Sequence, residues 1–521
     1  MDAVRHTGHG PGRRRRRAAA AVGACTLLAT ACASPHAGKP PAATHLAAAG
    51  AARSGDGRPE PARHYAQRPT WEPCEDEPSY QCTVIEAPLD YAHPESGDIT
   101  LAVTRLRSTG TPSERIGSLL YSPGGPGDSA VGGLREIAGD FSPAMRAAYD
   151  LVAVDPRGVG ASTPLECGTA APATVTGSRA FSGGKPEFEA LDKAREETAD
   201  ACLRHSGRLL PHVGTPDAAR DLDLVRALVS DDRLHYLGFS YGTYLGATYA
   251  GLFPSRVGRM VLDGAVDPAI EDYRRFLDPA HGYQVAWEAF AADCVSRPGC
   301  PVGRSAAEAG RVLDALVARL DRNPRREGKD VAFTGDDLLR IVLTALKKPA
   351  WGELRLALGE VVASAGDSAA LQRLSAAQED AVADVGFTAV SCLSAALGPV
   401  FTPAQAEALV PAFRRASPQF GAYYSALLTT CAHWPVGPAR PARAFPAPPT
   451  APILVVGTLR DPTTPYSWAQ ALTRLFPSAR LLTWDGDGHT AYLQPGSACV
   501  DAVVDRYLLG GGLPPAGTVC P

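Results

Sequence analysis

The sequence has little net charge and no concentration of basic residues in its main body. Its 521 residues carry a formal net charge of -4, and the dense basic run Arg13–Arg17 lies at the extreme N-terminus. A nucleic-acid-binding surface needs clustered positive charge, so we expect no nucleic-acid partner. With 45% hydrophobic and 20% charged residues, the composition is neither disordered nor fibrous. The chain is long enough to bury one large core with a second lobe.

The N-terminal apolar run, Ala18–Ala31, is too short to span a bilayer comfortably as a helix. It follows the arginine run and precedes small residues around Cys32, which is the layout of an export signal over residues 1–33. Leu28–Cys32 resembles a lipoprotein signal, in which cleavage frees Cys32 for lipidation and membrane attachment. Ordinary signal-peptidase cleavage beside Cys32 is the alternative. We therefore expect an exported protein, either extracellular or lipid-anchored to the outer face of a bacterial cell membrane.

Metal-binding cysteine spacings are absent. Of the 12 cysteines, Cys25 and Cys32 lie in the signal, and neighbouring pairs among the rest have neither C-x-x-C spacing nor a His cluster, so we expect no metal. An even number of cysteines in an exported chain argues for disulfides. The sequence does not decide their connectivity. Neighbour pairing would give five local loops: Cys74 with Cys82, Cys167 with Cys202, Cys294 with Cys300, Cys392 with Cys431, and Cys499 with Cys520.

The most informative motif is the G-x-S-x-G turn centred on Ser240, between an apolar run that begins at Leu234 and a helical run from Tyr241 to Leu252. A sharp strand-to-helix turn strains the serine backbone and exposes the hydroxyl, while glycines let strand and helix approach closely. In a Gly-rich chain the pattern also occurs by chance. The strand and helix around it favour Ser240 as a nucleophile.

A glycine- and proline-rich loop, Pro123-Gly124-Gly125-Pro126-Gly127, follows the predicted strand Ser118–Ser122. Glycines let backbone amides face a ligand without obstruction. Where a serine attacks a carbonyl, one oxyanion donor comes from such a loop and the other from the amide after the nucleophile. We therefore assign Gly125 and Tyr241 to an oxyanion hole. A plain turn is the alternative reading of the loop.

Asp461 and His489 each follow a predicted strand near the C-terminus, Pro452–Val456 and Arg480–Trp484. A serine hydroxyl is a poor nucleophile at neutral pH and needs an adjacent base. His489 would take its proton, and Asp461 would hold the imidazole tautomer and stabilise the imidazolium. Asp263 is the rival for the acid because it follows an earlier strand. The strand context favours Asp461.

The order of elements predicts an α/β fold. Two early strands, Thr83–Ala87 and Ile99–Leu106, alternate like a half-buried antiparallel pair. Later strands alternate with helices, which indicates a mostly parallel, doubly wound sheet. A helical pattern follows, with a predicted capping box at Ser305–Glu308. We expect an export signal (1–33), a flexible tether (34–70), the first part of the core (71–267), an inserted helical cap (268–445) and the C-terminal part of the core (446–521).

In combination these motifs resemble the exported tripeptidyl aminopeptidase-like branch of the α/β-hydrolase family, relatives of proline iminopeptidase. The resemblance extends from about Trp71 to the end of the chain. It implies an α/β-hydrolase fold and cleavage of a peptide bond near a free N-terminus, without metal or cofactor. The matching segments are Pro123-Gly124-Gly125-Pro126-Gly127, Asp155-Pro156-Arg157-Gly158-Val159-Gly160-Ala161-Ser162, Gly238-Phe239-Ser240-Tyr241-Gly242-Thr243, Asp461-Pro462-Thr463-Thr464-Pro465 and Gly488-His489-Thr490. Within them, we interpret Asp155 and Arg157 as braces for neighbouring loops.

The chain departs from the family pattern after Ala389–Cys392. An acidic residue usually follows this segment closely, whereas here it continues Leu393-Ser394-Ala395. An exopeptidase needs a carboxylate near the site to hold the substrate ammonium. Glu271 and Asp272, at the entrance to the cap, are weak substitutes.

Three functions remain open at this point. The leading hypothesis is a serine aminopeptidase that releases short peptides or residues from peptides with a free N-terminus, through an acyl-enzyme. A carboxylesterase with the same triad is the second, because the fold does not fix the substrate. A catalytically inert, anchored binding protein is the third.

Overall fold

A computed structural model describes residues 61–168, 184–270, 272–327, 331–363, 370–371, 373–374, 385–394, 400–437 and 447–521. These residues belong to one compact unit, Ala51–Pro521. The predicted signal with Cys32, most of the predicted tether, and Glu271 lie outside the described residues.

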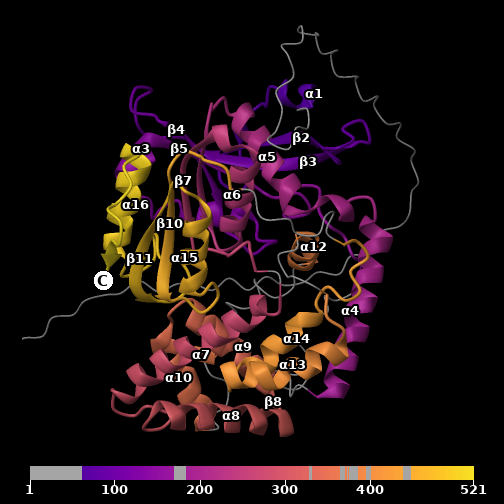
Figure 1. Ribbon diagram of the computed structural model, residues 1–521, viewed down its shortest axis with the longest axis vertical. Coiled ribbons are helices and arrows are strands. Elements are labelled where there is room, and N and C mark those ends of the chain that lie inside the picture. Colours follow the sequence, from indigo (N-terminus) through magenta and orange to yellow (C-terminus); the bar gives the residue numbers. More distant parts are fainter. Residues whose placement is uncertain are drawn as a thin grey trace, which may run out of the picture. The chain divides into compact units, whose positions relative to one another are not determined.

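A single ten-stranded sheet forms the centre of this unit, in the order β1-β2-β3-β5-β4-β6-β7-β10-β11-β12 (Figure 1). Strand β3 pairs antiparallel with β2 and β5, and every pairing from β5 to β12 is parallel. The predicted antiparallel pair and parallel sheet are therefore confirmed. The strands are β1 Glu72–Pro73, β2 Gln81–Pro88, β3 Asp98–Leu106, β4 Gly117–Ser122, β5 Tyr149–Val154, β6 Leu234–Phe239, β7 Val257–Asp263, β10 Ile453–Arg460, β11 Ala479–Asp487 and β12 Val519–Cys520.

Helices cover both faces of the sheet. On β5, Val152 and Val154 join one apolar cluster, whereas Leu151 and Ala153 join the other. Alternate side chains of a strand point to opposite faces, so a strand buried on both sides is apolar throughout. One face is covered by α5 Thr215–Leu228, α6 Tyr241–Leu252 and α15 Tyr466–Leu475, and the other by α2 Ala130–Ile137, α3 Pro143–Ala148 and α16 Ala498–Gly510.

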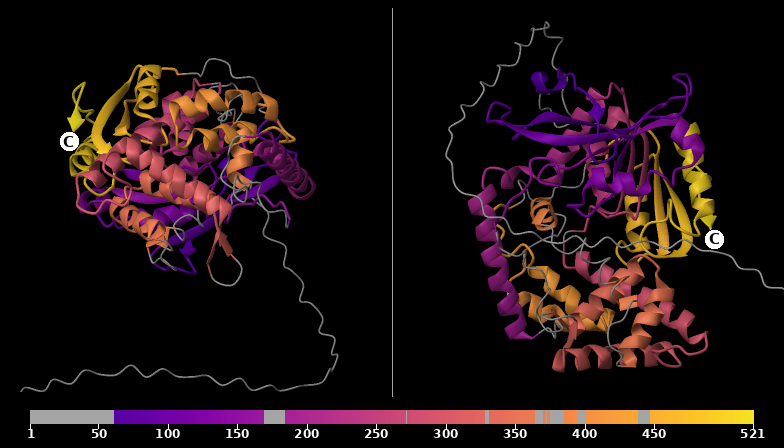
Figure 2. Two further views of the ribbon diagram at one scale, coloured as in Figure 1. Left: turned by 90° about the horizontal axis from the view of Figure 1, so that it is seen from below. Right: turned by 180° about the vertical axis from the view of Figure 1, so that it is seen from behind.

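Between β7 and β10 the chain is mainly helical, and these helices gather at one end of the sheet (Figures 1 and 2). The long helix α4, Lys185–Ser206, was not predicted and runs beside them; its Arg195 donates to the carbonyl of Ala426 at 2.9 Å. No helix in the described residues is long and apolar enough to cross a membrane. The region contains α7 Arg274–Val295, α8 Ala306–Arg322, the hairpin β8 Arg325–Glu327 and β9 Val331–Phe333, α9 Gly335–Lys347, α10 Trp351–Val362, α12 Val385–Leu393, α13 Pro403–Ala416 and α14 Gly421–Ala426.

Short 3-10 turns complete the elements, at Leu210–His212, Pro254–Arg256 and Leu427–Thr429. The capping box predicted at Ser305 forms only in part. Ser305 Oγ accepts from the Glu308 amide, but the Glu308 carboxylate accepts from the Arg304 amide instead of the Ser305 amide. Reciprocal boxes form at the starts of α9 and α13.

The ordered part of the chain begins before Trp71, so the predicted tether extends too far. Helix α1, Ala62–Tyr65, is held by the buried His64, whose Nε2 lies 2.9 Å from Asp98 Oδ1. Gln67 then pairs its side-chain amide with both backbone groups of Glu86 on β2, at 2.8 Å each. The Ala- and Pro-rich composition of this segment gave no indication of the contacts that His64 and Gln67 make, which fix the segment to the sheet.

All five neighbour pairs of cysteines are disulfides in the structure: Cys74–Cys82, Cys167–Cys202, Cys294–Cys300, Cys392–Cys431 and Cys499–Cys520. The connectivity that the sequence left open is therefore sequential. Each disulfide closes a loop between cysteines that are neighbours in the sequence. It therefore stabilises the fold mainly by restricting the conformations of the unfolded chain.

Arg157 lies in the interior and is 0% exposed. Its Nε and Nη2 donate to the two carboxylate oxygens of Asp221 at 2.7 Å, and its Nη1 donates to the carbonyls of Leu89 and His212. A buried guanidinium is tolerated only when its donors are satisfied in this way. Arg157 therefore braces three segments around α5, as its sequence context indicated.

We expect Arg157→Ala to lower the free energy of unfolding by about 3–5 kcal/mol, because it leaves Asp221 as a buried carboxylate without a cation. Chemical denaturation of the oxidised protein measures the loss. The matched control is Arg107→Ala: Arg107 is 60% exposed and lies 3.9 Å from Asp150, so the expected loss is below about 1 kcal/mol. Similar losses for both variants would contradict this reading.

Candidate active site

Ser240 lies in the sharp turn between β6 and α6, with φ 55° and ψ −124°. This is a backbone conformation that non-glycine residues rarely adopt. The flanking glycines are required by packing: a Cβ on Gly238 would lie 2.5 Å from the Gly242 carbonyl oxygen, and one on Gly242 would lie 2.9 Å from the Ser122 carbonyl oxygen. The G-x-S-x-G pattern therefore has the strained turn that the sequence predicted.

His489 and Asp461 are brought together at the same edge of the sheet. The imidazole Nδ1 lies 2.9 Å from Asp461 Oδ2 and 3.0 Å from Oδ1, and both residues are buried. The other ring nitrogen, Nε2, is buried and has no hydrogen-bond partner among the described residues. Because Asp461 engages Nδ1, Nε2 is the nitrogen left to accept a proton.

The Asp461 carboxylate is fixed by the turn that follows it. The amides of Thr463 and Thr464 both donate to Oδ1 at 2.9 Å, and the Thr464 hydroxyl donates to Oδ2 at 3.0 Å. Three donors on one carboxylate fix its orientation toward the imidazole. Thr464 was not among the predicted site residues. The pattern that could have indicated its role is the polar pair Thr463-Thr464 shortly after Asp461.

Asp263, the rival acid, contacts the histidine loop and not the imidazole. Its Oδ2 accepts from the amides of Ala491 and Tyr492 at 2.9 and 2.8 Å, and its backbone carbonyl accepts from the Ser240 amide at 2.9 Å. Burial raises the pKa of Asp263 to about 7. The carboxylate partner of His489 is therefore Asp461, and Asp263 joins the serine turn to the histidine loop.

The glycine-rich loop lies directly against the serine turn. A Cβ on Gly124, which has φ +112°, would lie 2.9 Å from Ser240 Cβ and 3.2 Å from the Tyr241 amide nitrogen. Gly125, with φ +95°, follows within the same loop. The loop backbone and the Tyr241 amide are thus neighbours, as two oxyanion donors must be.

Asp155 holds the backbone that follows the glycine-rich loop. Its Oδ1 accepts from the Ser129 hydroxyl at 2.7 Å and from the Val131 amide at 3.0 Å, and its Oδ2 accepts from the Ala161 amide at 2.9 Å. Both oxygens are engaged in holding backbone segments. The interpretation of Asp155 as a brace is consistent with these contacts.

The helical region also reaches the site. At the end of α9, the Lys347 carbonyl accepts from the His489 amide at 2.8 Å. From α7, the Tyr283 hydroxyl lies 3.0 Å from the Thr463 hydroxyl. His489 and the turn that follows Asp461 are therefore each held by a helix that lies outside the sheet. A contact through a backbone carbonyl leaves no pattern in the sequence, which is why it was missed.

Asp272, one of the two weak candidates for substrate binding, already has a cation. Although partial burial acts the other way, hydrogen bonds from Arg274 hold the pKa of Asp272 below its usual range. The Arg274 Nε lies 3.0 Å from each carboxylate oxygen. Glu271, the other candidate, lies outside the described residues.

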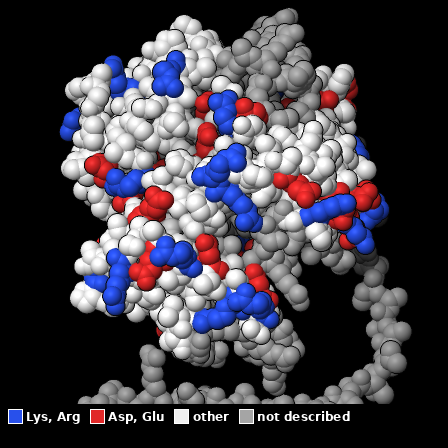
Figure 3. Space-filling view, turned by 60° about the horizontal axis from the view of Figure 1, so that its bottom comes forward, with Lys and Arg blue, Asp and Glu red and all other residues white. Residues whose placement is uncertain are grey.

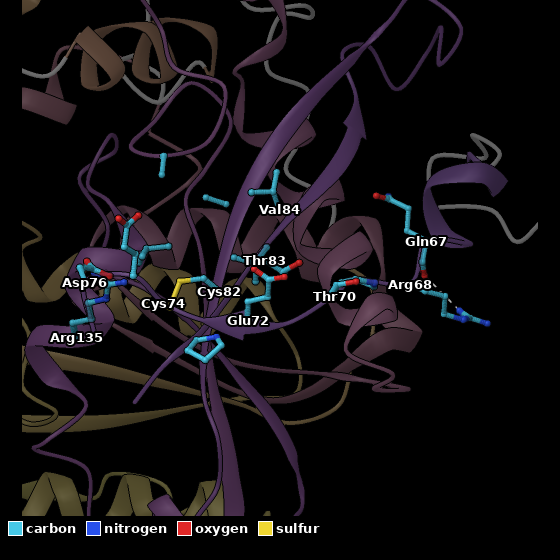
Figure 4. Close-up of a pocket in the computed structure, with 17 residues that line it drawn as sticks. Gln67, Arg68, Thr70, Glu72, Cys74, Asp76, Cys82, Thr83, Val84 and Arg135 are labelled. Carbon is cyan, nitrogen blue, oxygen red and sulfur yellow. Dashed lines mark hydrogen bonds and ion pairs between the residues drawn. A yellow bond between two sulfur atoms is a disulfide. The ribbon is translucent and has the colours of Figure 1, made fainter. Parts of the chain in front are cut away.

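A pocket of about 1090 Å³ lies away from this site, beside the β1–β2 edge of the sheet and α2 (Figure 4). Its lining includes Glu72, Asp76, Val84 and Arg135 and the Cys74–Cys82 disulfide. Ser240, Asp461 and His489 are not among the described residues that line it. Its size alone therefore does not make it the reaction site.

Comparison with known proteins agrees with this geometry. The family model described as "TAP-like protein" matches residues 417–520. The chain is 33% identical to the serine protease Hip1 of Mycobacterium tuberculosis, over 84% of this chain and 87% of that protein. It is 34% identical to a tripeptidyl aminopeptidase of Streptomyces coelicolor, over 84% and 83% of the two chains. It is also 34% identical to carboxylesterase B of Mycobacterium tuberculosis, over 84% and 86%.

We expect Asp461→Asn to lower kcat by about 10⁴-fold while the fold persists, because the amide stabilises the wrong imidazole tautomer. Turnover of a chromogenic peptide anilide or ester measures this. Asp263→Asn is the matched comparison. The kcat of this variant should fall by less than about tenfold, because residue 263 does not contact the imidazole. Its free energy of unfolding should be lower than that of the wild type, because a buried hydrogen-bonding group is altered. The opposite order of the two kcat losses would make Asp263 the acid.

Proposed function

Because the chain belongs to the TAP-like branch of the α/β-hydrolase family and is a serine hydrolase, we propose that it is an exported aminopeptidase that releases short peptides or residues from peptide N-termini. The observation that carries the proposal is the arrangement of the triad. His489 is bound to Asp461 through Nδ1, its Nε2 has no hydrogen-bond partner in the part of the chain that the structure describes, and Ser240 lies in a strained turn at the same sheet edge.

The proposed reaction proceeds in two halves. Ser240 Oγ attacks the scissile carbonyl carbon while His489 Nε2 takes the hydroxyl proton, and Asp461 stabilises the imidazolium. The amides of Gly125 and Tyr241 hold the oxyanion. His489 then gives its proton to the departing amine, the C–N bond breaks, and the acyl group stays on Ser240. Water, activated by the same histidine, releases the acyl group as a free carboxylate.

A carboxylesterase is the second candidate, and one specific observation favours it. Carboxylesterase B is as similar to this chain as the tripeptidyl aminopeptidase, over the same share of the chain. The same triad serves both reactions, because ester and amide differ in the leaving group and not in the attack. An inert binding protein is the weakest candidate, since it has no need for an Asp461 carboxylate that three donors orient toward His489.

Three matched substrates test the proposal: a peptide anilide with a free amine, its N-acetylated form, and a short-chain nitrophenyl ester. We expect the free-amine anilide to have the highest kcat/KM, and Ser240→Ala to reduce turnover to background. Equal turnover of free and blocked anilides would reject an aminopeptidase. Turnover of the ester alone would favour the carboxylesterase. Unchanged turnover in Ser240→Ala would reject the mechanism.

Export is supported by the predicted signal over residues 1–33 and by the five disulfides, which form in oxidising compartments. Positive and negative side chains are interspersed on the described part of the face in Figure 3, which suits a protein without a nucleic-acid partner.

We expect the mature chain to begin beside residue 32 and to resist thiol alkylation until it is reduced. Intact-mass spectrometry measures both properties, and a lipid adduct on Cys32 would distinguish the anchored form from the secreted one. A chain that keeps residues 1–33 and has all 12 cysteines as free thiols would contradict export.

A further inference from the structure

Asp128 stands at the end of the glycine-rich loop, directly before Ser129, the N-cap of α2. A Cβ on Gly125 would lie 3.1 Å from Asp128 Cγ, and a Cβ on Gly124 would lie 2.9 Å from Ser240 Cβ. These contacts place the Asp128 carboxyl within about 12 Å of the Ser240 side chain, a distance that about three extended residues span. Asp128 is therefore within reach of a short acyl group bound to Ser240.

Asp128 is exposed to water, and charged side chains of the helical region act on it. The side chain is exposed, yet burial by the protein around it raises the pKa of Asp128, and Lys347 and Lys348 act against this rise. Burial lowers the pKa of Lys347, while Asp128 and Asp461 both act to raise it. The charge of Lys347 thus interacts with both carboxylates. Its backbone carbonyl accepts from the His489 amide at 2.8 Å, so Asp128 and the triad share this residue as a neighbour.

The carboxylate of Asp128 is also available. Among the described residues it accepts no hydrogen bond, and Lys347 and Lys348 lie beyond ion-pair distance. The other acidic side chains near the site are engaged: Asp461 by His489, Asp263 and Asp155 by backbone amides, and Asp272 by Arg274. Asp128 therefore offers an unpaired negative charge at the reaction site.

We propose that Asp128 binds the N-terminal ammonium of the substrate and thereby selects peptides with a free N-terminus. The proposal rests on the aminopeptidase function proposed above. A free ammonium complements a carboxylate that has no cation of its own, and it can donate charge-assisted hydrogen bonds to both carboxylate oxygens. The two lysines lie too far from Asp128 to form an ion pair with it, so they leave the carboxylate free. Asp128 then takes the ammonium-binding role of the acidic residue that usually follows the segment ending at Cys392 and that this chain lacks there.

The test compares free-amine and N-acetylated peptide anilides with acyl groups of one, two and three residues. In Asp128→Asn we expect KM for the free-amine substrates to rise by about tenfold or more with kcat little changed, because a binding contact common to ground and transition states is lost. The ratio of kcat/KM for free over blocked substrates should fall toward one. The acyl length with the largest change gives the number of residues between Asp128 and the scissile bond.

The matched control is Asp140→Asn, which makes the same change of charge at an exposed position beyond the other end of α2. It should keep the wild-type ratio. Asp128→Glu should restore part of the preference. Lys348→Gln should lower KM for free-amine substrates, because it removes a positive charge that acts on Asp128 and would repel the substrate ammonium. Thermal unfolding of each variant separates a loss of recognition from a loss of fold.

The outcomes distinguish this inference from the proposed function. If the wild-type enzyme turns over free and blocked peptides equally, the aminopeptidase function itself fails. If the wild-type enzyme prefers the free amine and Asp128→Asn keeps that preference, the role of Asp128 is rejected while the function stands. An equal loss on free and blocked substrates in Asp128→Asn would likewise reject it and indicate a structural role.

Discussion

The geometry of the site depends on one buried residue that performs two tasks. Through its backbone carbonyl, Asp263 holds the Ser240 amide, and through its side chain it holds the amides of Ala491 and Tyr492. It lies at the end of β7, between the strand that leads to the serine and the strand that leads to the acid. Loops after parallel strands meet at one edge of the sheet but have no fixed distance from one another. Asp263 sets the distance between two of these loops. Its carboxylate accepts hydrogen bonds from the histidine loop, while its backbone carbonyl accepts one from the serine turn.

The helical region also supports the sheet edge at which the proposed catalytic groups lie. The Lys347 carbonyl accepts from the His489 amide, and the Tyr283 hydroxyl lies beside the Thr463 hydroxyl in the turn that orients Asp461. A change in these helices would therefore disturb the support of His489 and of the Asp461 turn. The chain is similar to proteins named as a peptidase and as an esterase, and one fold can serve both reactions because the fold does not fix the substrate.

Much of the fold could be predicted because periodicity and strand ends are local properties. The helix Tyr241–Leu252 begins and ends where its pattern indicated. Ser240, Asp461 and His489 follow β6, β10 and β11, parallel strands of one sheet in which β7 separates β6 from β10. Other features depend on contacts between distant segments. Helix α4 has a weakly amphipathic pattern and was missed, and α1 is fixed by single polar contacts within a segment of tether-like composition. The preference for Asp461 over Asp263 rested on strand context, but the separate contacts of the two carboxylates are visible only in three dimensions.

The pairing of Gln67 with Glu86 has a consequence for how the molecule behaves among its neighbours. An outer β-strand presents backbone donors and acceptors that another chain can use to extend the sheet. On β2, the short strand β1 occupies one end of this edge, and the Gln67 amide occupies the Glu86 position with a donor and an acceptor of its own, much as a further strand would. The last residues of the predicted tether thus occupy part of the sheet edge that another chain would otherwise use for edge-to-edge pairing.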